Sequence, residues 1–378
     1  MGMKRIGLMC VILLVAFSFV WAGGQKEAEE TEEMPEKDTL TWMLWWEPEW
    51  GEDNINWIID TFKEDHPNVE IETVSVPYDD YYDKLVTLIQ GGQTPDVYGM
   101  EQAWIPAIHK LGALEDIGPM LDQNPDMKEV IPGSAVLEFD DGVRMLYLYQ
   151  MGYHFAYNVD LMEELGFDKP GSWSELKTWL RNVKESDAAR YGLALQFDPK
   201  NVDHVVSRLT FTPIIQLGGQ ITDDQGRAAF NSSEGVEALE YWQSLIDEEL
   251  VFPDPLGTTE SSMYEMMASG VLPMQLNGPW VAPVVSGSNP DVTIEYLPVF
   301  EEAEQNGTYL SGSGVGLSPS SANPDLAWEF FAHLWSDKVS DKMAKETQVP
   351  WANKKTLSAD FIKNDPILGP QAAMLSNP

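Results

Sequence analysis

The sequence predicts an α/β protein with two domains, and two observations carry this prediction. Short apolar or alternating runs recur between helical patterns from Thr39 onward, with brief connections, and this order is typical of a parallel α/β sheet. The chain has 378 residues, of which 43% are hydrophobic. That length exceeds what one hydrophobic core normally serves, so two domains are expected.

The first three strands and two helices are predicted between residues 39 and 98. Residues 39–46 are continuously apolar, as in a strand covered on both faces, and residues 69–74 alternate like a second strand. The helix between them should start at Asp53 or Asn54 as its cap. Residues 95–98 open the third strand. The apolar stripes of the two helices comprise Ile55, Ile58, Ile59 and Phe62, then Tyr82, Leu85, Val86 and Ile89.

The same alternation resumes after residue 150. Residues 155–158 suit a strand, and Ser172 with Glu175 three residues later predicts a helix that begins with a capping box. Further helices are expected at 233–249 and 324–338; the first carries Val236, Leu239, Trp242 or Gln243, and Ile246 at helical spacing. The glycine run at 312–316 has no helix start after it, so it indicates a strand or hinge turn rather than a dinucleotide loop.

The amino-terminal residues have the parts of an export signal. Lys4 and Arg5 precede an apolar run, and small residues follow it. We therefore expect a signal peptide at 1–22, an acidic flexible leader at 23–38, and a periplasmic or extracellular location. Cys10, the only cysteine, lies inside the apolar run, so a lipid anchor is not expected. Without it the mature chain has no thiol for a disulfide or a metal site.

Charge and motifs exclude several function classes. The net charge of -38 repels phosphate backbones and anionic lipids, which argues against nucleic acid or a membrane surface as a partner. Zincin, nucleophile-elbow and Walker motifs are absent from the sequence, and no cofactor or metal is expected. One enzymatic alternative stays open, because Glu47 and Glu49 could form the carboxyl pair of a glycosidase.

Tryptophans 42, 45, 46 and 50 fall in the segment TLTWMLWWEPEWG. Trp42 alternates with Leu40 and Leu44 and suits the core. Trp45 and Trp46 lie at the carboxyl end of the predicted strand, where open α/β sheets bind ligands. Core packing and contact with a sugar ring are both open for these two indoles.

Five segments together resemble a known family, the extracellular solute-binding proteins of ABC importers, and within it the sugar-binding group that includes maltose-binding protein. The segments are similar to that family in order and spacing across residues 39–355. They are GGQTPDV with MEQAW from residue 91, YNVDL with GSWSEL from 157, the helix 234–253, MQLNGPW from 274, and NPDLAWEF from 323.

The resemblance implies a two-lobed periplasmic-binding-protein fold with a cleft between the lobes and crossovers that act as hinges near Leu148, Pro290 and Trp335. Lobe 1 would comprise residues 38–148 and 291–335, and lobe 2 residues 149–290 and 336–378. Family members usually continue well beyond the position of Ala372, so the carboxyl-terminal part of lobe 2 is expected to be short.

The resemblance also implies a ligand-binding cleft and a role. The implied cleft residues are Trp45, Trp46, Glu47, Glu101, Trp104, Gln150, Trp280 and Trp351, with Trp280 stacking on a sugar. A monomer would capture a carbohydrate and deliver it to membrane permease subunits, without catalysis. The alternatives are the same role for a polyol, a polyamine or a peptide, or a secreted glycan-active enzyme.

Overall fold

The computed structural model describes residues 38–186, 191–199, 205–297, 300, 309–365, 368, 369, 371 and 372. The chain divides into two units, Met1–Glu36 and Lys37–Pro378, and all described residues belong to the second. The predicted signal peptide and nearly all of the predicted leader therefore lie outside the described residues. Within the described residues, no helix has both the length and the apolar character that a membrane span requires.

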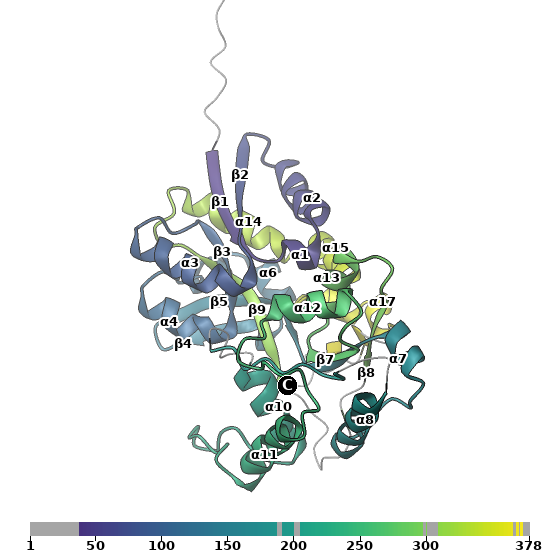
Figure 1. The fold of residues 1–378 in the computed structure, drawn as a ribbon. Helices are drawn as coiled ribbons and strands as arrows, with labels where there is room; N and C mark the ends of the chain where they lie inside the picture. Colours follow the sequence, from purple (N-terminus) through teal and green to yellow (C-terminus); the bar gives the residue numbers. More distant parts are fainter. Residues whose placement is uncertain are drawn as a thin grey trace, which may run out of the picture. The chain divides into compact units, whose positions relative to one another are not determined.

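Six strands form the first sheet (Figure 1). In sheet order they are β2 (Val69–Ser75), β1 (Asp38–Leu44), β3 (Val97–Glu101), β9 (Ser311–Leu317), β5 (Gly142–Met151) and β4 (Val136–Phe139). A second sheet contains β7 (Met274–Asn277), β6 (His154–Asn158) and β8 (Ile294–Leu297) in that order. The strands predicted at residues 39–46, 69–74, 95–98 and 155–158 are thus present, with ends shifted by at most three residues.

The predicted parallel sheet is only partly right. β1 pairs in parallel with β2 and with β3, as expected for strands joined by a helix. β9, however, runs antiparallel to both β3 and β5, and the second sheet is antiparallel throughout. β9 comes from a distant part of the chain, so no helical crossover forces it to run in the same direction as β3.

The glycines of β9 explain how this strand fits between its neighbours. A Cβ atom on Gly314 would lie 2.1 Å from the backbone oxygen of Leu146, and one on Gly316 would lie 2.5 Å from the side chain of Leu114. Glycine is needed there for close approach to the neighbouring strand and side chains. Of the two structures predicted for residues 312–316, a strand or a hinge turn, the structure has the strand.

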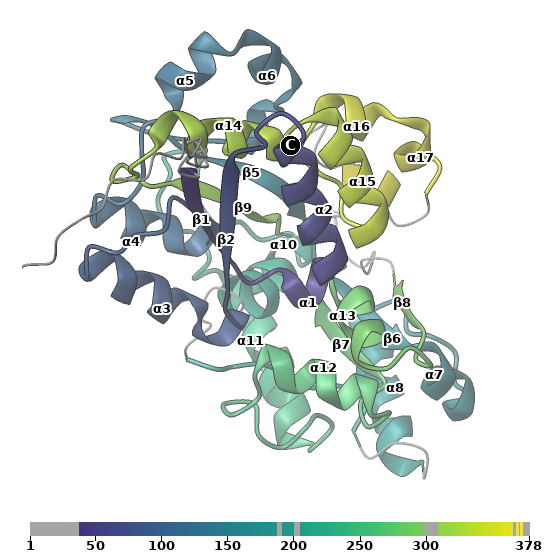
Figure 2. The same cartoon turned by 90° about the horizontal axis from the view of Figure 1, so that it is seen from above.

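Helices flank both sheets, and Figure 2 shows α2 beside α15 and α16. Those before β5 are α1 (Glu47–Trp50), α2 (Glu52–Lys63), α3 (Tyr78–Gln90), α4 (Ile105–Lys110), α5 (Gly118–Gln123) and α6 (Pro125–Val130). Those between β6 and β8 are α7 (Val159–Leu165), α8 (Trp173–Glu185), the π-helical segment Val205–Phe211, α10 (Thr212–Gln216), α11 (Ser233–Asp247), α12 (Glu260–Ala268) and α13 (Val281–Ser288). α14 (Pro324–Leu334), α15 (Asp337–Thr347), α16 (Lys354–Ser358) and α17 (Asp360–Lys363) follow β9.

Two helix starts test the predicted caps. Ser172 accepts a hydrogen bond from the Glu175 backbone N–H at 3.1 Å, which confirms it as the cap of α8. The carboxylate of Glu175 accepts instead from the N–H of Gly171, so the box is completed one residue earlier than expected. The predicted cap of α2 at Asp53 or Asn54 is wrong: the helix begins at Glu52 after Gly51, whose φ of 80° ends α1 and redirects the chain.

The predicted inner face of α11 is right at Trp242, but the other buried positions each lie one residue before the predicted ones. Val236 and Leu239 are 54% and 52% exposed, whereas the buried residues of the helix are Gly235, Ala238, Trp242 and Leu245. A Cβ on Gly235 would lie 1.9 Å from the backbone oxygen of Phe230. The close approach of these two backbones turns Gly235 inward and leaves Val236 outside.

The core is organised around the two sheets. Trp42 is fully buried in the cluster around the first sheet, which confirms its predicted place. The described part of residues 336–372 adds buried side chains of α15 and α16 to that same cluster. The prediction assigns this segment to lobe 2, but the apolar face of α15, including Val339 and Met343, packs with the first sheet.

The strands also bear on the predicted crossovers. The chain passes from the first sheet to the second between Met151 and His154, close to the crossover predicted near Leu148. The return lies after β8, since β8 pairs with β6 in the second sheet, whereas the prediction put it near Pro290. The division into two lobes at stated residues stays a prediction.

Candidate functional site

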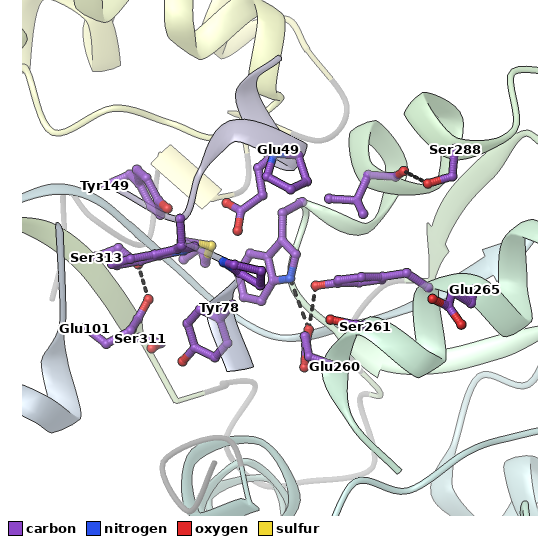
Figure 3. Close-up of a pocket in the computed structure, with 17 residues that line it drawn as sticks. Glu49, Tyr78, Glu101, Tyr149, Glu260, Ser261, Glu265, Ser288, Ser311 and Ser313 are labelled. Carbon is purple, nitrogen blue, oxygen red and sulfur yellow. Dashed lines mark hydrogen bonds between the residues drawn. The ribbon is translucent and has the colours of Figure 1, made fainter. Parts of the chain in front are cut away.

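A pocket of about 220 Å³ lies between elements of the two sheets (Figure 3). Its lining is rich in aromatic and acidic side chains. From the side of the first sheet come Trp45, Glu49, Tyr78, Glu101, Tyr149, Ser311 and Ser313; from the side of the second come Glu260, Ser261, Tyr264, Glu265 and Trp280. Apolar walls with a few convergent polar groups are the usual composition of a small-molecule site.

The short helix α1 decides which side chains of the first loop reach the pocket. Pro48 lies in its first turn, where the missing N–H costs nothing. The Trp50 N–H donates to the Trp46 backbone oxygen at 2.7 Å, and the two indoles stack with centroids 4.5 Å apart. The two stacked rings lie in the core, and Glu49, on another side of the helix, lines the pocket.

Burial and a facing carboxylate raise the pKa of Glu49 to about 8, against an ordinary value of 4.5. Removal from water is the larger cause, the charge of Glu260 across the pocket is the second, and a hydrogen bond with Trp45 acts in the opposite direction. Glu49 is therefore largely protonated at neutral pH when the pocket is empty.

Glu49 gives a testable prediction. The pKa of Glu49 in the folded chain lies above its unfolded value. Below pH 4.5 the carboxyl is protonated in both states and costs no stability. As the pH rises towards 8 the unfolded chain releases the proton more readily than the folded chain does, so the free energy of unfolding falls. Glu49→Gln should raise the free energy of unfolding by about 2 kcal/mol at pH 8, after allowance for solvent in the pocket, and leave it almost unchanged at pH 4. Urea unfolding at both pH values measures this.

Glu47→Gln is the matched control, because Glu47 lies on the same helix but is exposed. It should change stability by less than about 0.5 kcal/mol at either pH. An equal gain for Glu49→Gln at pH 4 and pH 8 would contradict the assignment of the effect to ionisation.

Trp280 is held over the pocket by a glycine and a glutamate. It follows Gly278, where a Cβ would lie 1.9 Å from the indole ring, so only glycine leaves room for this ring position. The indole Nε1 donates to Glu260 Oε1 at 3.3 Å. Trp280 is partly buried and packs against the hydrophobic clusters of both sheets. It is therefore positioned by both halves of the chain.

Glu260 is the centre of a buried polar network. Its carboxylate accepts from Arg208 at 3.0 Å, from Asn277 at 2.7 Å and from the hydroxyl of Tyr264 at 2.6 Å. The side chains of Arg208 and Glu260 are 1% and 4% exposed. Arg208 comes from the π-helical segment Val205–Phe211, so an irregular turn carries the guanidinium to the carboxylate.

Glu101 ends β3, where the strand opens towards the pocket. It is 8% exposed and its carboxylate accepts a hydrogen bond from Ser313 of the neighbouring strand β9. The pairing of β3 with β9 places these two residues opposite each other. The sheet itself therefore fixes this acceptor.

The family model described as bacterial extracellular solute-binding protein matches residues 47–340 of the chain. This range covers most of the chain, including the whole second sheet and every strand of the first sheet except β1. The chain belongs to this family.

Relatives and solved structures agree with the assignment. This solute-binding protein is 22% identical over 321 residues to a putative binding protein of Brucella abortus, covering 83% of the chain and 76% of the relative. It is 24% identical over 291 residues to the arabinooligosaccharide-binding protein of Bacillus subtilis, covering 72% and 64%. An ABC transporter solute-binding protein of Thermotoga lettingae, solved with α-D-tagatose, superposes with a TM-score of 0.75 at 25% identity, covering 88% and 86%. The predicted two-lobed periplasmic-binding-protein fold is confirmed.

Of the residues predicted for the cleft of this solute-binding protein, three line the pocket: Trp45, Glu101 and Trp280. Trp45 is only 3% exposed, and its ring packs against Trp46 and Trp104. Their contact with a ligand stays a prediction.

The other predicted residues do not line the pocket, for separate reasons. Trp46 and Trp351 are fully buried, and each packs against Trp50. Trp104 stacks on Tyr81 behind Trp45. These three indoles lie in the layer behind the pocket wall.

Two polar residues also miss the pocket. Gln150 points to the opposite face of β5 from its neighbours Tyr149 and Met151, which do line the pocket, because side chains alternate along a strand. Glu47 is exposed outside the pocket, so Glu47 and Glu49 do not face one pocket as the carboxyl pair of a glycosidase would.

The sequence reasoning missed Tyr78, Tyr149, Glu260 and Tyr264. Pro77 before Tyr78 marks a helix start at the end of β2, which was a usable signal. Thr259 and Ser262 likewise form a capping box at the start of α12. No local pattern shows that α12 lies across the pocket from α1, because that placement depends on tertiary packing.

Proposed function

We propose that this solute-binding protein is the substrate-binding component of an ABC importer, which captures a carbohydrate in the pocket and delivers it to a membrane permease. The observation that carries the proposal is the pocket itself: aromatic rings and carboxylates converge on one space from the sides of both sheets. Family membership supports the same role.

The lining suits the two surfaces of a sugar. Trp280 and Tyr78 offer flat apolar area to the C–H faces of a ring, and the small exposed part of Trp45 adds to it. Glu101 and Ser313 offer hydrogen-bonding atoms to hydroxyl groups. A hydroxyl buried without a partner costs about 1–3 kcal/mol, so the positions of the polar groups select among sugars. Ligand contact with both sides favours the closed arrangement over an open one.

One hydrogen bond already joins the two sides at the pocket. Ser261 of α12 lines the pocket, and its hydroxyl donates to Asp79 of α3 at 2.7 Å. The two helices flank different sheets. We infer that this bond helps to hold the closed arrangement once a ligand is inside.

The volume points to a small sugar. About 220 Å³ lies below the usual range of ligand pockets, which starts near 300 Å³. A mono- or disaccharide fits such a space better than a long oligosaccharide. The Thermotoga lettingae protein bound with α-D-tagatose supports a monosaccharide.

The residues proposed to contact the ligand are Trp45, Glu101 and Trp280 from the sequence, together with Glu49, Tyr78 and Tyr264 from the structure. No residue is proposed to be catalytic. We also propose that the chain acts outside the cytoplasmic membrane as a monomer, as expected for a partner of permease subunits.

A thermal-shift screen tests the function. The panel holds monosaccharides, disaccharides, polyols, peptides and polyamines. A sugar that binds only the folded chain, present at 100 times its Kd, should stabilise it by about 2.7 kcal/mol and raise Tm by several degrees. Tryptophan fluorescence should change with the same midpoint. A shift with polyols, peptides or polyamines alone would contradict the carbohydrate, and release of hydrolysis products would contradict a binding-only role.

A further inference from the structure

The pocket carries more negative charge than a neutral ligand requires. Four glutamates line it: Glu49, Glu101, Glu260 and Glu265. Among its described lining residues there is no lysine, arginine or histidine. Arg208, behind the wall, balances Glu260 alone. If all four glutamates were ionised, the pocket would therefore carry net negative charge.

Glu49 is the carboxylate whose negative charge would be least compensated in the pocket. Glu260 is already bonded to Arg208, Asn277 and Tyr264, and Glu101 is bonded to Ser313. Glu265 lies at the exposed rim. Glu49, whose hydrogen-bond partner is the neutral indole of Trp45, approaches the pocket from the side opposite Glu260, as Figure 3 shows.

Aromatic faces enclose the same space. Trp45 and Tyr78 pack edge to face at 5.7 Å on one side, while Tyr264 and Trp280 both donate to Glu260 on the other. A cation over an aromatic face gains about 0.5–2 kcal/mol, more when water is excluded. Carboxylates between aromatic rings therefore favour a positively charged group over a hydroxyl.

We propose that the sugar taken by this pocket carries a protonated amino group, as in a 2-amino-2-deoxyhexose, and that Glu49 binds the ammonium as a carboxylate. This inference rests on the proposed carbohydrate-binding function and names its substrate class. An ammonium would balance the charge that burial and Glu260 otherwise disfavour on Glu49. A neutral sugar would leave that cost uncompensated.

The charged and titratable groups facing Glu49 define its pH response. They are Glu260 and Tyr264 of α12, Tyr149 of β5, and Glu101 at the end of β3, with exposed Glu47 on its own helix. Burial holds the pKa of Tyr149 and Tyr264 well above 10, so neither ionises near neutral pH. Glu49 is thus the group expected to lose a proton when an ammonium enters.

Isothermal titration of the full chain at pH 6.5 tests the proposal. The probes are glucosamine, galactosamine and mannosamine, each with its N-acetyl and its parent hexose as neutral matches. At least one amino sugar should bind about 10-fold or more tightly than both neutral matches. Titration in two buffers of different ionisation enthalpy should show release of roughly one proton per ligand.

Variants separate the role of Glu49 from general effects. Glu49→Gln, which is expected to be at least as stable as the parent, should lose most of the preference for the amino sugar and all of the proton release. Glu47→Gln should keep both. Equal affinity for charged and neutral sugars overturns the inference and leaves the proposed function standing. Binding of putrescine with no binding of any sugar overturns both.

Discussion

Arg208→Met is expected to lower the free energy of unfolding by about 3–5 kcal/mol, because it leaves Glu260 as a buried charge without its counter-ion. The pair is 3.0 Å apart and both side chains are almost fully buried. Methionine keeps much of the volume, so the loss of charge dominates the effect. Urea unfolding at pH 7 measures it.

Two further variants identify the cause. Arg208→Met combined with Glu260→Gln removes both charges and should recover more than half of the loss. Arg227→Met breaks an ion pair of similar length, 2.7 Å to Asp223, whose arginine is 75% exposed, and should cost less than about 1 kcal/mol. A double variant as unstable as Arg208→Met alone would mean that packing, rather than charge, holds this region together.

Trp280→Ala should weaken sugar binding about 100-fold, because it removes an indole face and the apolar contact that goes with it. The variant should also lower Tm, since Trp280 packs against the clusters of both sheets. Affinity is therefore measured by titration at a temperature where circular dichroism shows the variant to be folded.

Trp57→Ala is the matched control. Trp57 is also partly buried, but it lies on α2 beneath Lys338 and Lys342, outside the pocket lining. It should leave affinity unchanged, and Trp280→Phe should recover part of the loss by restoring a smaller ring. Unchanged affinity in folded Trp280→Ala would remove Trp280 from the site.

Much of the fold could be predicted because short-range patterns decide it. The stripe of Ile55, Ile58 and Phe62 and the apolar run of β1 depend on spacing alone, and both are present. The direction of β9 could not be predicted from alternation. Its neighbours β3 and β5 lie far away in the sequence, and only the glycines show that a close approach is needed.

Pocket residues at the ends of strands could be predicted from the sequence, whereas those on a helix distant in the sequence could not. Trp45, Glu101 and Trp280 follow or end the strands β1, β3 and β7, so position in the sheet leads to them. Glu260 and Tyr264 come from a helix whose place depends on the packing of the whole second half. The run of indoles near Trp46 does not show which rings are buried, because the burial of Trp46 depends on its stacking onto Trp50.

The central place of β9 sets an order for folding. Until residue 317 is available, β3 and β5 each present an unpaired edge, since the strand between them is missing. Completing the sheet needs contacts between residues more than 150 positions apart, such as Tyr147 with Gly314. Such distant pairing slows folding, and open strand edges invite association between chains. A nascent chain that ends before β9 should therefore depend on a chaperone to stay monomeric.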